Sequence, residues 1–495
     1  MVMSTESKKP YFNFDNSFVK SLDGFFKFCK AEPAASPKLL QFNHALAEEI
    51  GLDPLALDSE AGLEIFCGNV IPQGSEPIAQ AYAGHQFGGF SPQLGDGRAL
   101  LLGEVMDTRQ QRRDIQLKGS GRTPFSRGGD GRAAVGPVLR EYLVGEGMHA
   151  LGIPTTRALA AVATGNNVYR ETLLAGAVLT RVASSHIRVG TFEYGAARGD
   201  ENKVRELADY SIKRHYPDTA DADNPYLAFF AAVADAQASL VAQWMCVGFI
   251  HGVMNTDNMT ISGETIDYGP CAFMDKYSPG TKFSSIDHHG RYAYANQPQI
   301  LMWNLTRLAE TLIPFVDPDN KRAIEMLTEV IESIIPLYES YWLAGMRSKI
   351  GLSSEDPGDM QLINDLLKVM AEGQADFTLV FRRLSGVLRG DSEVVRQLFK
   401  EPGAFDAWEH RWRKRLEQEE PAATPEMMDR VNPIYIPRNH KVEEALSAAT
   451  AHQDMAPFSK LLSVLKHPFD EVEGKEAYAE PAPETGIPYR TFCGT

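Results

Sequence analysis

Cysteine is scarce in this chain, and its five cysteines are scattered over 495 residues. No two of them form a C-x-x-C pair, which argues against a zinc ribbon and against a secreted scaffold held by disulfides. The N-terminal residues carry neither an apolar signal core nor an Arg-rich amphipathic presequence. We therefore expect a protein of the reducing cytoplasm.

The chain also lacks an excess of positive charge and an uninterrupted apolar span. Its formal net charge is −16, which argues against bulk binding of nucleic acid or of anionic membranes. The longest apolar stretch, residues 227–250, is interrupted by Asp235, Gln237 and Gln243. We interpret it as a buried helix rather than a membrane span, in a protein that contacts neither membrane nor nucleic acid.

Several common motifs are missing as well. Gly474-Lys475 is followed by Glu476, so there is no Walker-A loop, and the glycine loop at 119–121 does not continue as G-x-G-x-x-G. Neither G-x-S-x-G nor H-E-x-x-H occurs. His288-His289 with Asp287 has no third ligand at a matching spacing, so we assign it a structural role. These absences argue against P-loop, Rossmann, nucleophile-elbow and zincin sites.

Between residues 77 and 132 the chain is rich in glycine, and two strand-like runs lie among the glycines, at 98–106 and 113–118. Residues 135–151 then predict a helix, with Pro137 in its first turn and Gly152 after its end. Further strands are expected at 158–164 and 171–182, around a turn at Gly165-Asn166-Asn167. This order predicts a small lobe built on a sheet.

The rest of the chain is mainly helical. Asn224-Pro225 caps a long helix expected to run to Phe249, and two short strands are expected around Gly263. A tail from residue 473 contains Pro481, Pro483 and Pro488 and is expected to be flexible. Amphipathic helices are predicted at 300–315, 322–346 and 361–370, and a charged helix at 405–419.

The most informative segment is 251–258, His-Gly-Val-Met-Asn-Thr-Asp-Asn, followed by Ile-Asp-Tyr-Gly at 266–269. Asn258 and Asp267 offer oxygen ligands that suit Mg²⁺ on nucleotide phosphates, and Asp257 can accept a hydroxyl proton. A plain turn rich in Asx residues is the alternative. The pattern is typical of a protein-kinase catalytic loop, but Val253 stands where a kinase has its catalytic Asp. The segment indicates either an inactive kinase or a kinase fold with different chemistry.

Four charged residues can complete such a site. Lys118 ends a predicted strand and Glu141 lies on the following helix, as in the kinase pair that directs a lysine at phosphates. Arg181 and Arg188 follow an apolar strand and can supply forked donors to a terminal phosphate. The alternative for all four is an ordinary surface or structural role.

Two glycine loops, at 95–98 and 119–131, stand next to the predicted strands. Glycine lets backbone N–H groups approach phosphates closely because no Cβ intervenes. Plain turns explain such loops equally well.

Longer segments carry a resemblance to a known family. The chain resembles the selenoprotein O family, protein adenylyltransferases with a kinase-like fold, over nearly its whole length. The segments that carry the resemblance are 82–88 (Tyr-Ala-Gly-His-Gln-Phe-Gly), 94–98, 116–121, 130–133, 139–142, 251–258, 266–270 and 432–440.

The resemblance implies an activity and a set of site residues. ATP would bind flipped relative to kinases, and AMP would pass to Ser, Thr or Tyr hydroxyls of proteins with Mg²⁺, releasing pyrophosphate. UMP transfer with Mn²⁺ is a further implied activity. Asp257 would be the proton acceptor, and Asn258 and Asp267 the metal ligands. The implied nucleotide-binding residues are Gly95, Gly97, Arg98, Lys118, Asp130, Gly131, Glu141, Arg181, Arg188 and Asp267.

The expected fold is α+β: a two-lobed, protein-kinase-like core with a sheet lobe, a mainly helical lobe and a helical C-terminal extension. We expect an N-terminal extension packing on the core at 1–74 and a nucleotide-binding lobe at 75–220. The catalytic-loop part of the large lobe follows at 221–310. A helical region is expected at 311–472 and a flexible tail at 473–495.

The tail also matches the family, some of whose members carry selenocysteine at the position of Cys493. Our hypothesis is that Cys493 forms a reversible disulfide with a core cysteine such as Cys271 and lowers activity when oxidised. An exposed thiol without a partner is the alternative.

Two rival functions stay open: a conventional kinase that transfers the γ-phosphate, and a nucleotide-binding scaffold without catalysis. We expect a monomer acting on protein substrates, whose identity the sequence does not indicate.

Overall fold

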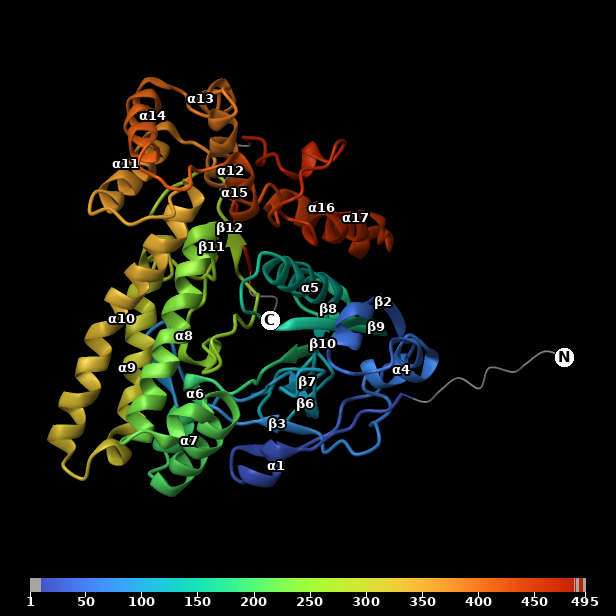
Figure 1. The fold of residues 1–495 in the computed structure, drawn as a ribbon. Coiled ribbons are helices and arrows are strands. Elements are labelled where there is room, and N and C mark those ends of the chain that lie inside the picture. The colour runs from blue at the N-terminus through green and yellow to red at the C-terminus, as the bar shows by residue number, and fades with distance from the viewer. Residues whose placement is uncertain (1–9, 485, 487–488, 493–495) are drawn as a thin grey trace.

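The structure is a computed structural model that describes residues 10–484, 486 and 489–492. Within these residues, an antiparallel sheet of eight strands forms one part of the molecule and a group of long helices another (Figure 1). The strand order is β1-β3-β6-β7-β10-β9-β2, and β8 pairs with β10 beside this path. The bounds are β1 Phe26–Phe28, β2 Lys38–Phe42, β3 Ile78–Gln80, β6 Ala99–Met106, β7 Arg112–Lys118, β8 Ala133–Ala134, β9 Arg157–Tyr169 and β10 Leu173–Ala183. The predicted α+β class is confirmed.

Strands β6 and β7 confirm the two strands predicted after the first glycine loop. Every residue of β6 except Met106 is buried, as expected of a short apolar run in the middle of a sheet. The turn between them is held by Asp107, whose carboxylate accepts the backbone N–H groups of Arg109 and Gln111. Lys118 therefore lies at the end of β7, paired with Ala99 at the start of β6.

The reversal between β9 and β10 differs from the prediction. The chain turns at residues 170–172, and Gly165 lies inside β9, where the pairing with β10 shifts register. Gly165 has φ +74°, and a Cβ there would lie 2.7 Å from the backbone nitrogen of Ser36. Gly165 thus marks a bulge against a neighbouring segment rather than a hairpin turn.

Helix α5 (Val135–Ala150) confirms the helix predicted at 135–151 and packs on β9 and β10. Helices α16 (Asn439–His452) and α17 (Ala456–Leu465) pack against α5 in turn (Figure 1). Glu141 is therefore held among buried side chains, where a carboxylate needs a partner.

Helix α8 (Pro225–Val247) packs against the two long helices α9 (Gln297–Val316) and α10 (Asn320–Lys349). The Asn224 side chain accepts the N–H of Leu227 at its start, as expected of an N-cap. The helix ends two residues before the predicted Phe249, because Gly248 adopts the left-handed conformation. Among the described residues, α8 alone is long and apolar enough to cross a membrane, and half of its most apolar window is buried in the fold.

The segment that follows α8 is bracketed by a two-stranded ribbon, β11 (Phe249–Ile250) with β12 (Ala272–Phe273). The strands predicted around Gly263 are instead single bridges, Thr260 with Arg188 and Thr265 with Thr155. A tight turn at residues 261–263 leaves too few residues for a longer ladder.

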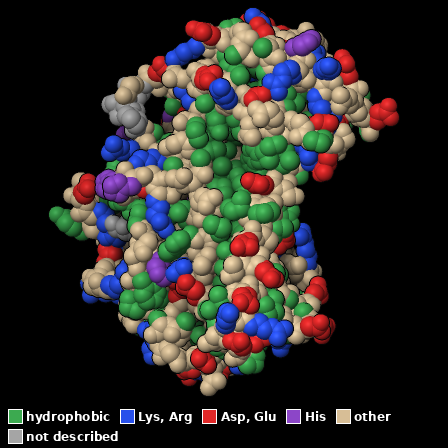
Figure 2. Space-filling model, turned by 90° about the vertical axis from the view of Figure 1, so that its left-hand side faces the viewer, with side chains coloured by type: hydrophobic (Ala, Val, Ile, Leu, Met, Phe, Trp, Pro, Cys, Tyr) green, Lys and Arg blue, Asp and Glu red, His purple; other side chains and the backbone are tan. Residues whose placement is uncertain are grey.

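The remaining helices surround these elements. Seen from the side of α9 and α10, apolar side chains gather in a band down the middle of the surface, bordered by charges of both signs (Figure 2). The net negative charge of the chain therefore does not form a single acidic face on this side. The remaining bounds are α1 Ser17–Ser21, α2 His44–Glu49, α3 Pro54–Leu57, α4 Glu60–Phe66, α6 Val189–Ala196, α7 Glu201–His215, α11 Asp359–Gly373, α12 Phe377–Leu388, α13 Glu393–Arg396, α14 Gly403–Leu416 and α15 Pro425–Val431, with short 3-10 turns at Pro217–Asp221, Thr256–Asn258, Tyr294–Asn296 and Glu476–Tyr478.

Residues near both ends of the described chain pair with the rest of the fold. Residues 10–74 supply β1 and β2, the two outer strands of the sheet path. Near the other end, the Thr491 N–H donates to the carbonyl of Phe283 and the Ser285 N–H donates to the carbonyl of Thr491. Cys493, to which we assigned a disulfide, lies outside the described residues.

Candidate active site

A large cavity lies where the sheet meets the segment between β11 and β12. Its volume is about 1210 Å³, above the usual 300–1,000 Å³ or so of small-molecule pockets. All the predicted site residues line it: Gly95, Gly97, Arg98, Lys118, Asp130, Gly131, Glu141, Arg181, Arg188, Asp257, Asn258 and Asp267. Residues separated by up to 172 positions in the sequence are thus brought to one place.

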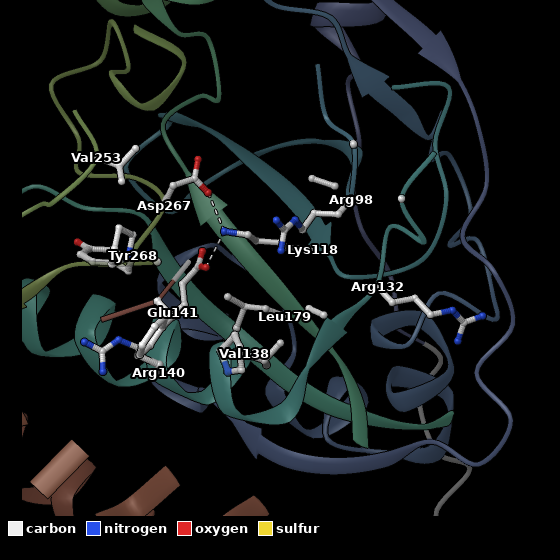
Figure 3. A pocket seen from close by; sticks show the side chains of 18 of the residues that line it. Arg98, Lys118, Arg132, Val138, Arg140, Glu141, Leu179, Val253, Asp267 and Tyr268 are labelled. Atoms are coloured by element: carbon white, nitrogen blue, oxygen red, sulfur yellow. Dashed lines mark hydrogen bonds and ion pairs between the residues drawn. The ribbon is translucent and has the colours of Figure 1, made fainter. Parts of the chain in front are cut away.

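Lys118 contacts two carboxylates at once. Its Nζ lies 2.7 Å from Oε2 of Glu141 and 2.7 Å from Oδ1 of Asp267 (Figure 3). The end of β7 supplies the lysine, α5 supplies the glutamate, and the loop after segment 251–258 supplies the aspartate. The predicted lysine–glutamate pair is therefore present, and Asp267 completes it.

Two buried arginines extend this network. Arg181 on β10 is 2% exposed and Arg188, just before α6, is 1% exposed. Nη1 of Arg181 lies 2.9 Å from Oδ1 of Asp267, and Nη2 of Arg188 lies 3.6 Å from its Oδ2. Three cations therefore converge on one carboxylate, and burying so much charge is costly unless every member is paired.

Asp267 is the centre of this cluster. Burial alone would raise the pKa of its carboxyl, but Lys118, Arg181 and Arg188 together hold that pKa well below its usual value. Its backbone adopts φ +62°, a left-handed conformation that Asp tolerates better than most residues. The strained backbone turns the side chain toward the three cations, as expected of a functional position.

Asp257 lies in the 3-10 turn Thr256–Asn258 and has a different environment. It is 7% exposed, and burial raises the pKa of its carboxyl to about 6, partly offset by a hydrogen bond from Gln86. Nε2 of Gln86 donates to Oδ2 of Asp257 over 3.1 Å. A carboxylate with a pKa near neutrality is well suited to accept a proton.

The loop around these groups is built by close backbone contacts. Nε2 of His251 donates to the carbonyl oxygen of Ile266 over 2.8 Å, which joins segment 251–258 to the residue before Asp267. Gly252 has φ +80°, and a Cβ there would lie 2.6 Å from the carbonyl oxygen of Pro270. Val253 lies in the cavity wall close to Asp267 (Figure 3). The position of the kinase base is thus occupied by a packed aliphatic group.

Asn258 and Asp267 fit the chemistry of a divalent metal site. Nδ2 of Asn258 donates to the carbonyl of Val253 over 3.0 Å, which fixes the amide and leaves its oxygen for a ligand. In the described part of the chain no cluster of three or more His, Cys, Asp or Glu side chains could hold a metal by itself. An amide and a carboxylate, completed by phosphate oxygens and water, are what Mg²⁺ or Mn²⁺ takes.

Residues of both glycine loops also line the cavity. A Cβ on Gly95 would lie 2.4 Å from the Phe125 ring, and a Cβ on Gly131 would lie 2.0 Å from the carbonyl oxygen of Gly121. These glycines are required for loop packing, whether or not they contact a ligand. Asp130 is paired with Arg170 over 2.8 Å at the rim of the cavity.

Three further residues belong to the site, although the sequence did not single them out. Asp96 is buried, accepts hydrogen bonds from the Gln80 N–H and from Nε2 of Gln116, and lies 3.8 Å from Nη2 of Arg188. Arg188 also lies over the Tyr82 ring, 4.4 Å from its centroid. Gln86 is the third, through its contact with Asp257. All three lie in segments that carry the family resemblance, 82–88 and 94–98, but apart from an aspartate between two glycines at 95–97 their residue types indicated no role in the site.

Comparison with known proteins identifies the family of the chain. The family model described as "Protein adenylyltransferase SelO" matches residues 10–466. A protein from Cereibacter sphaeroides strain KD131, named "Protein nucleotidyltransferase YdiU", is 61% identical over 486 residues, which cover 98% of this chain and all of the relative. Proteins of the same name from Methylorubrum extorquens and Rhizobium johnstonii are 57% and 58% identical, over 98% of this chain and 99% and 97% of their own.

Proposed function

The chain belongs to the protein adenylyltransferase SelO family, and on this premise we propose that it transfers AMP from ATP to Ser, Thr or Tyr hydroxyls of proteins. Membership in the family makes it a protein nucleotidyltransferase. The specific donor, the acceptor residues and the metal are our proposal.

The observation that carries the proposal is the difference between two kinds of group in one cavity. Lys118, Arg181 and Arg188 gather at Asp267, whereas the Asp257 carboxylate forms no ion pair with any of these three cations, and burial raises its pKa. A cluster of three cations suits an anionic leaving group such as pyrophosphate better than the single phosphoryl group that a kinase transfers. This supports an ATP orientation with the β- and γ-phosphates inward and the α-phosphate toward the acceptor.

The reaction follows from these positions. The acceptor oxygen attacks the α-phosphorus, the bond from that phosphorus to the bridging oxygen of the β-phosphate breaks, and Asp257 takes the hydroxyl proton. Lys118, Arg181 and Arg188 stabilise the charge that develops on pyrophosphate. Gln86 holds the Asp257 carboxylate.

Asn258 and Asp267 would hold a divalent ion, Mg²⁺ in the principal reaction, which would neutralise phosphate charge. The same oxygen ligands accept Mn²⁺, so UMP transfer with Mn²⁺ is part of the proposal.

We also propose a kinase-like division into a sheet lobe and a helical lobe, based on the arrangement of β7, α5 and the 251–271 segment. We further propose that the protein is cytoplasmic and monomeric.

One experiment separates this function from its rivals. The full-length protein is incubated, alone and with a desalted cell extract, with Mg²⁺ and ATP labelled on either the α- or the γ-phosphate. AMP transfer labels protein from α-labelled ATP only and releases pyrophosphate. Label from γ-labelled ATP would identify a kinase, and no label from either would leave a binding scaffold.

A further inference from the structure

A short hairpin of strands β4 (Gly84–Gln86) and β5 (Gly89–Ser91) lies against the catalytic loop. Its two-residue turn, Phe87-Gly88, has φ +51° and +86°, as in the tight turns that fit the twist of a hairpin. A phenylalanine in this conformation is unfavourable, so the surroundings of the turn must hold it. The hairpin is therefore a defined element rather than a loose loop.

Three consecutive hairpin residues each bond one of three consecutive loop residues. The His85 N–H donates to Oγ1 of Thr256 over 2.7 Å, Nε2 of Gln86 donates to Oδ2 of Asp257 over 3.1 Å, and the Phe87 N–H donates to Oδ1 of Asn255 over 3.2 Å. The backbone contacts on either side fix the position from which the Gln86 side chain reaches Asp257.

Glu193 on α6 contacts both the hairpin and the loop. Its carboxylate accepts the hydroxyl of Thr256 with one oxygen and contacts Nδ1 of His85 with the other. Glu193 is 5% exposed, so a buried carboxylate ties the hairpin and the loop to the same helix. Removing such a partner leaves buried polar groups unpaired.

The Asp257 carboxylate has few other constraints. Within the described chain, Gln86 is the one side chain that donates a hydrogen bond to it, and its Oδ1 is buried without a hydrogen-bond partner. On that side Gly84 packs so closely that a Cβ would lie 2.6 Å from Oδ1. One oxygen is thus covered and the other is oriented by a single amide.

From these contacts we propose that Gln86 is a positioning residue for the transfer reaction, which orients the Asp257 carboxylate toward the acceptor hydroxyl while taking no part in nucleotide binding. The inference rests on the proposed role of Asp257 as proton acceptor. A misplacement of about 1 Å at a reacting group can lower a rate about a hundred-fold, so an amide that fixes one carboxylate oxygen is important to the rate.

The test uses Gln86→Met, which keeps the length of the side chain and removes the donor. We expect kcat for AMP transfer to fall about 10- to 100-fold, while the dissociation constant of a non-hydrolysable ATP analogue stays within about two-fold. Gln93→Met is the matched control, because Gln93 is exposed just beyond β5 and its partner is Arg198 on the surface. This control should transfer AMP at the wild-type rate.

A double-mutant cycle separates positioning from a general structural role. If Gln86 acts through Asp257, Gln86→Met should have little further effect in an Asp257→Asn background. An undiminished kcat in Gln86→Met would overturn the inference. So would a parallel loss of kcat, ATP affinity and thermal stability, or a full additional loss in the Asp257→Asn background. Wild-type protein that transfers no AMP would instead refute the proposed function itself.

Discussion

Nζ of Lys118 and Oδ1 of Asp267 lie 2.7 Å apart. The cation assigned to phosphate and the carboxylate assigned to the metal therefore neutralise each other when neither ligand is bound. Arg181 and Arg188 reinforce the same carboxylate. Nucleotide binding has to exchange these partners, so each member of the cluster should affect nucleotide affinity.

Lys118→Met is expected to weaken ATP binding about 10- to 100-fold. A hydrogen bond to a charged group contributes about 1.5–3 kcal/mol, and about 1.4 kcal/mol corresponds to a factor of ten in affinity. Calorimetric titration with a non-hydrolysable ATP analogue and Mg²⁺ measures the change. Lys321→Met, at an exposed site on α10, is the control. Equal affinities of Lys118→Met and wild type would contradict the assignment of Lys118 to phosphate.

Asp257→Asn and Asp267→Asn should both lower transfer of the α-label to a small residual rate, about 100-fold or more below wild type, but for different reasons. Asp257→Asn removes the proton acceptor and should leave ATP affinity nearly unchanged. Asp267→Asn removes a metal ligand and should weaken ATP binding in the presence of Mg²⁺. The measurement is transfer activity alongside nucleotide affinity for each variant. Transfer at the wild-type rate in both variants would show that the site assignment is wrong.

Transfer activity should depend on pH through Asp257. Burial raises the pKa of this carboxyl to about 6, and the ionised form accepts the proton. The value of kcat/KM should therefore be constant well above pH 6 and fall about ten-fold per pH unit below it. Initial rates between pH 5 and 8 at constant ionic strength test this, with folding monitored at each pH. A profile without change across this range would exclude Asp257 as the base.

Lys349 offers a prediction on stability, far from the cavity. It is 3% exposed, its Nζ lies 4.4 Å from the centre of the Phe381 ring, and burial lowers the pKa of its amine to about 8. A lowered lysine pKa means that the charged form is disfavoured in the folded state at neutral pH. Lys349→Met should thus raise the free energy of unfolding at pH 7 by about 2–3 kcal/mol.

The pH dependence of that gain has a definite sign. The gain should be full below about pH 8 and should shrink as pH rises toward 10.5, where the lysine is neutral in both states. Denaturant unfolding at pH 7 and pH 10 measures it, with Lys368→Met on the surface of α11 as the control. A loss of stability at pH 7 would show that contacts with the Phe377 and Phe381 rings outweigh the cost of burying the charge.

Much of the fold was predictable because local patterns and tertiary packing agree. The strands β6 and β7 and the helix α5 lie within a residue or two of their predicted bounds, since apolar runs, Pro137 and Gly152 all indicate the same elements. Gly165 misled the prediction because a glycine marks a bulge as readily as a turn. Whether Gly165 forms a bulge or a turn depends on its packing against Ser36, which is distant in sequence.

The residues of the site likewise fall into those that the sequence could predict and those that it could not. Lys118, Glu141, Asp257, Asn258 and Asp267 were predictable because their residue types and order carry the chemistry. Gln86 was not predictable, because it becomes a partner of Asp257 only when the β4–β5 hairpin lies on a loop about 170 residues later. Asp96 is similar, since its distance to Arg188 depends on how β3 and the first glycine loop pack.

The close packing around Asp257 also limits which sequences this site can accept. Gly84 has no room for a Cβ beside Oδ1 of Asp257, and at Gly190 a Cβ would lie 2.2 Å from the carbonyl oxygen of Ala83. Saturation libraries at these two positions, selected for transfer, should return glycine at both. Two residues with no functional group of their own would then be as diagnostic of an active homologue as the charged residues they surround.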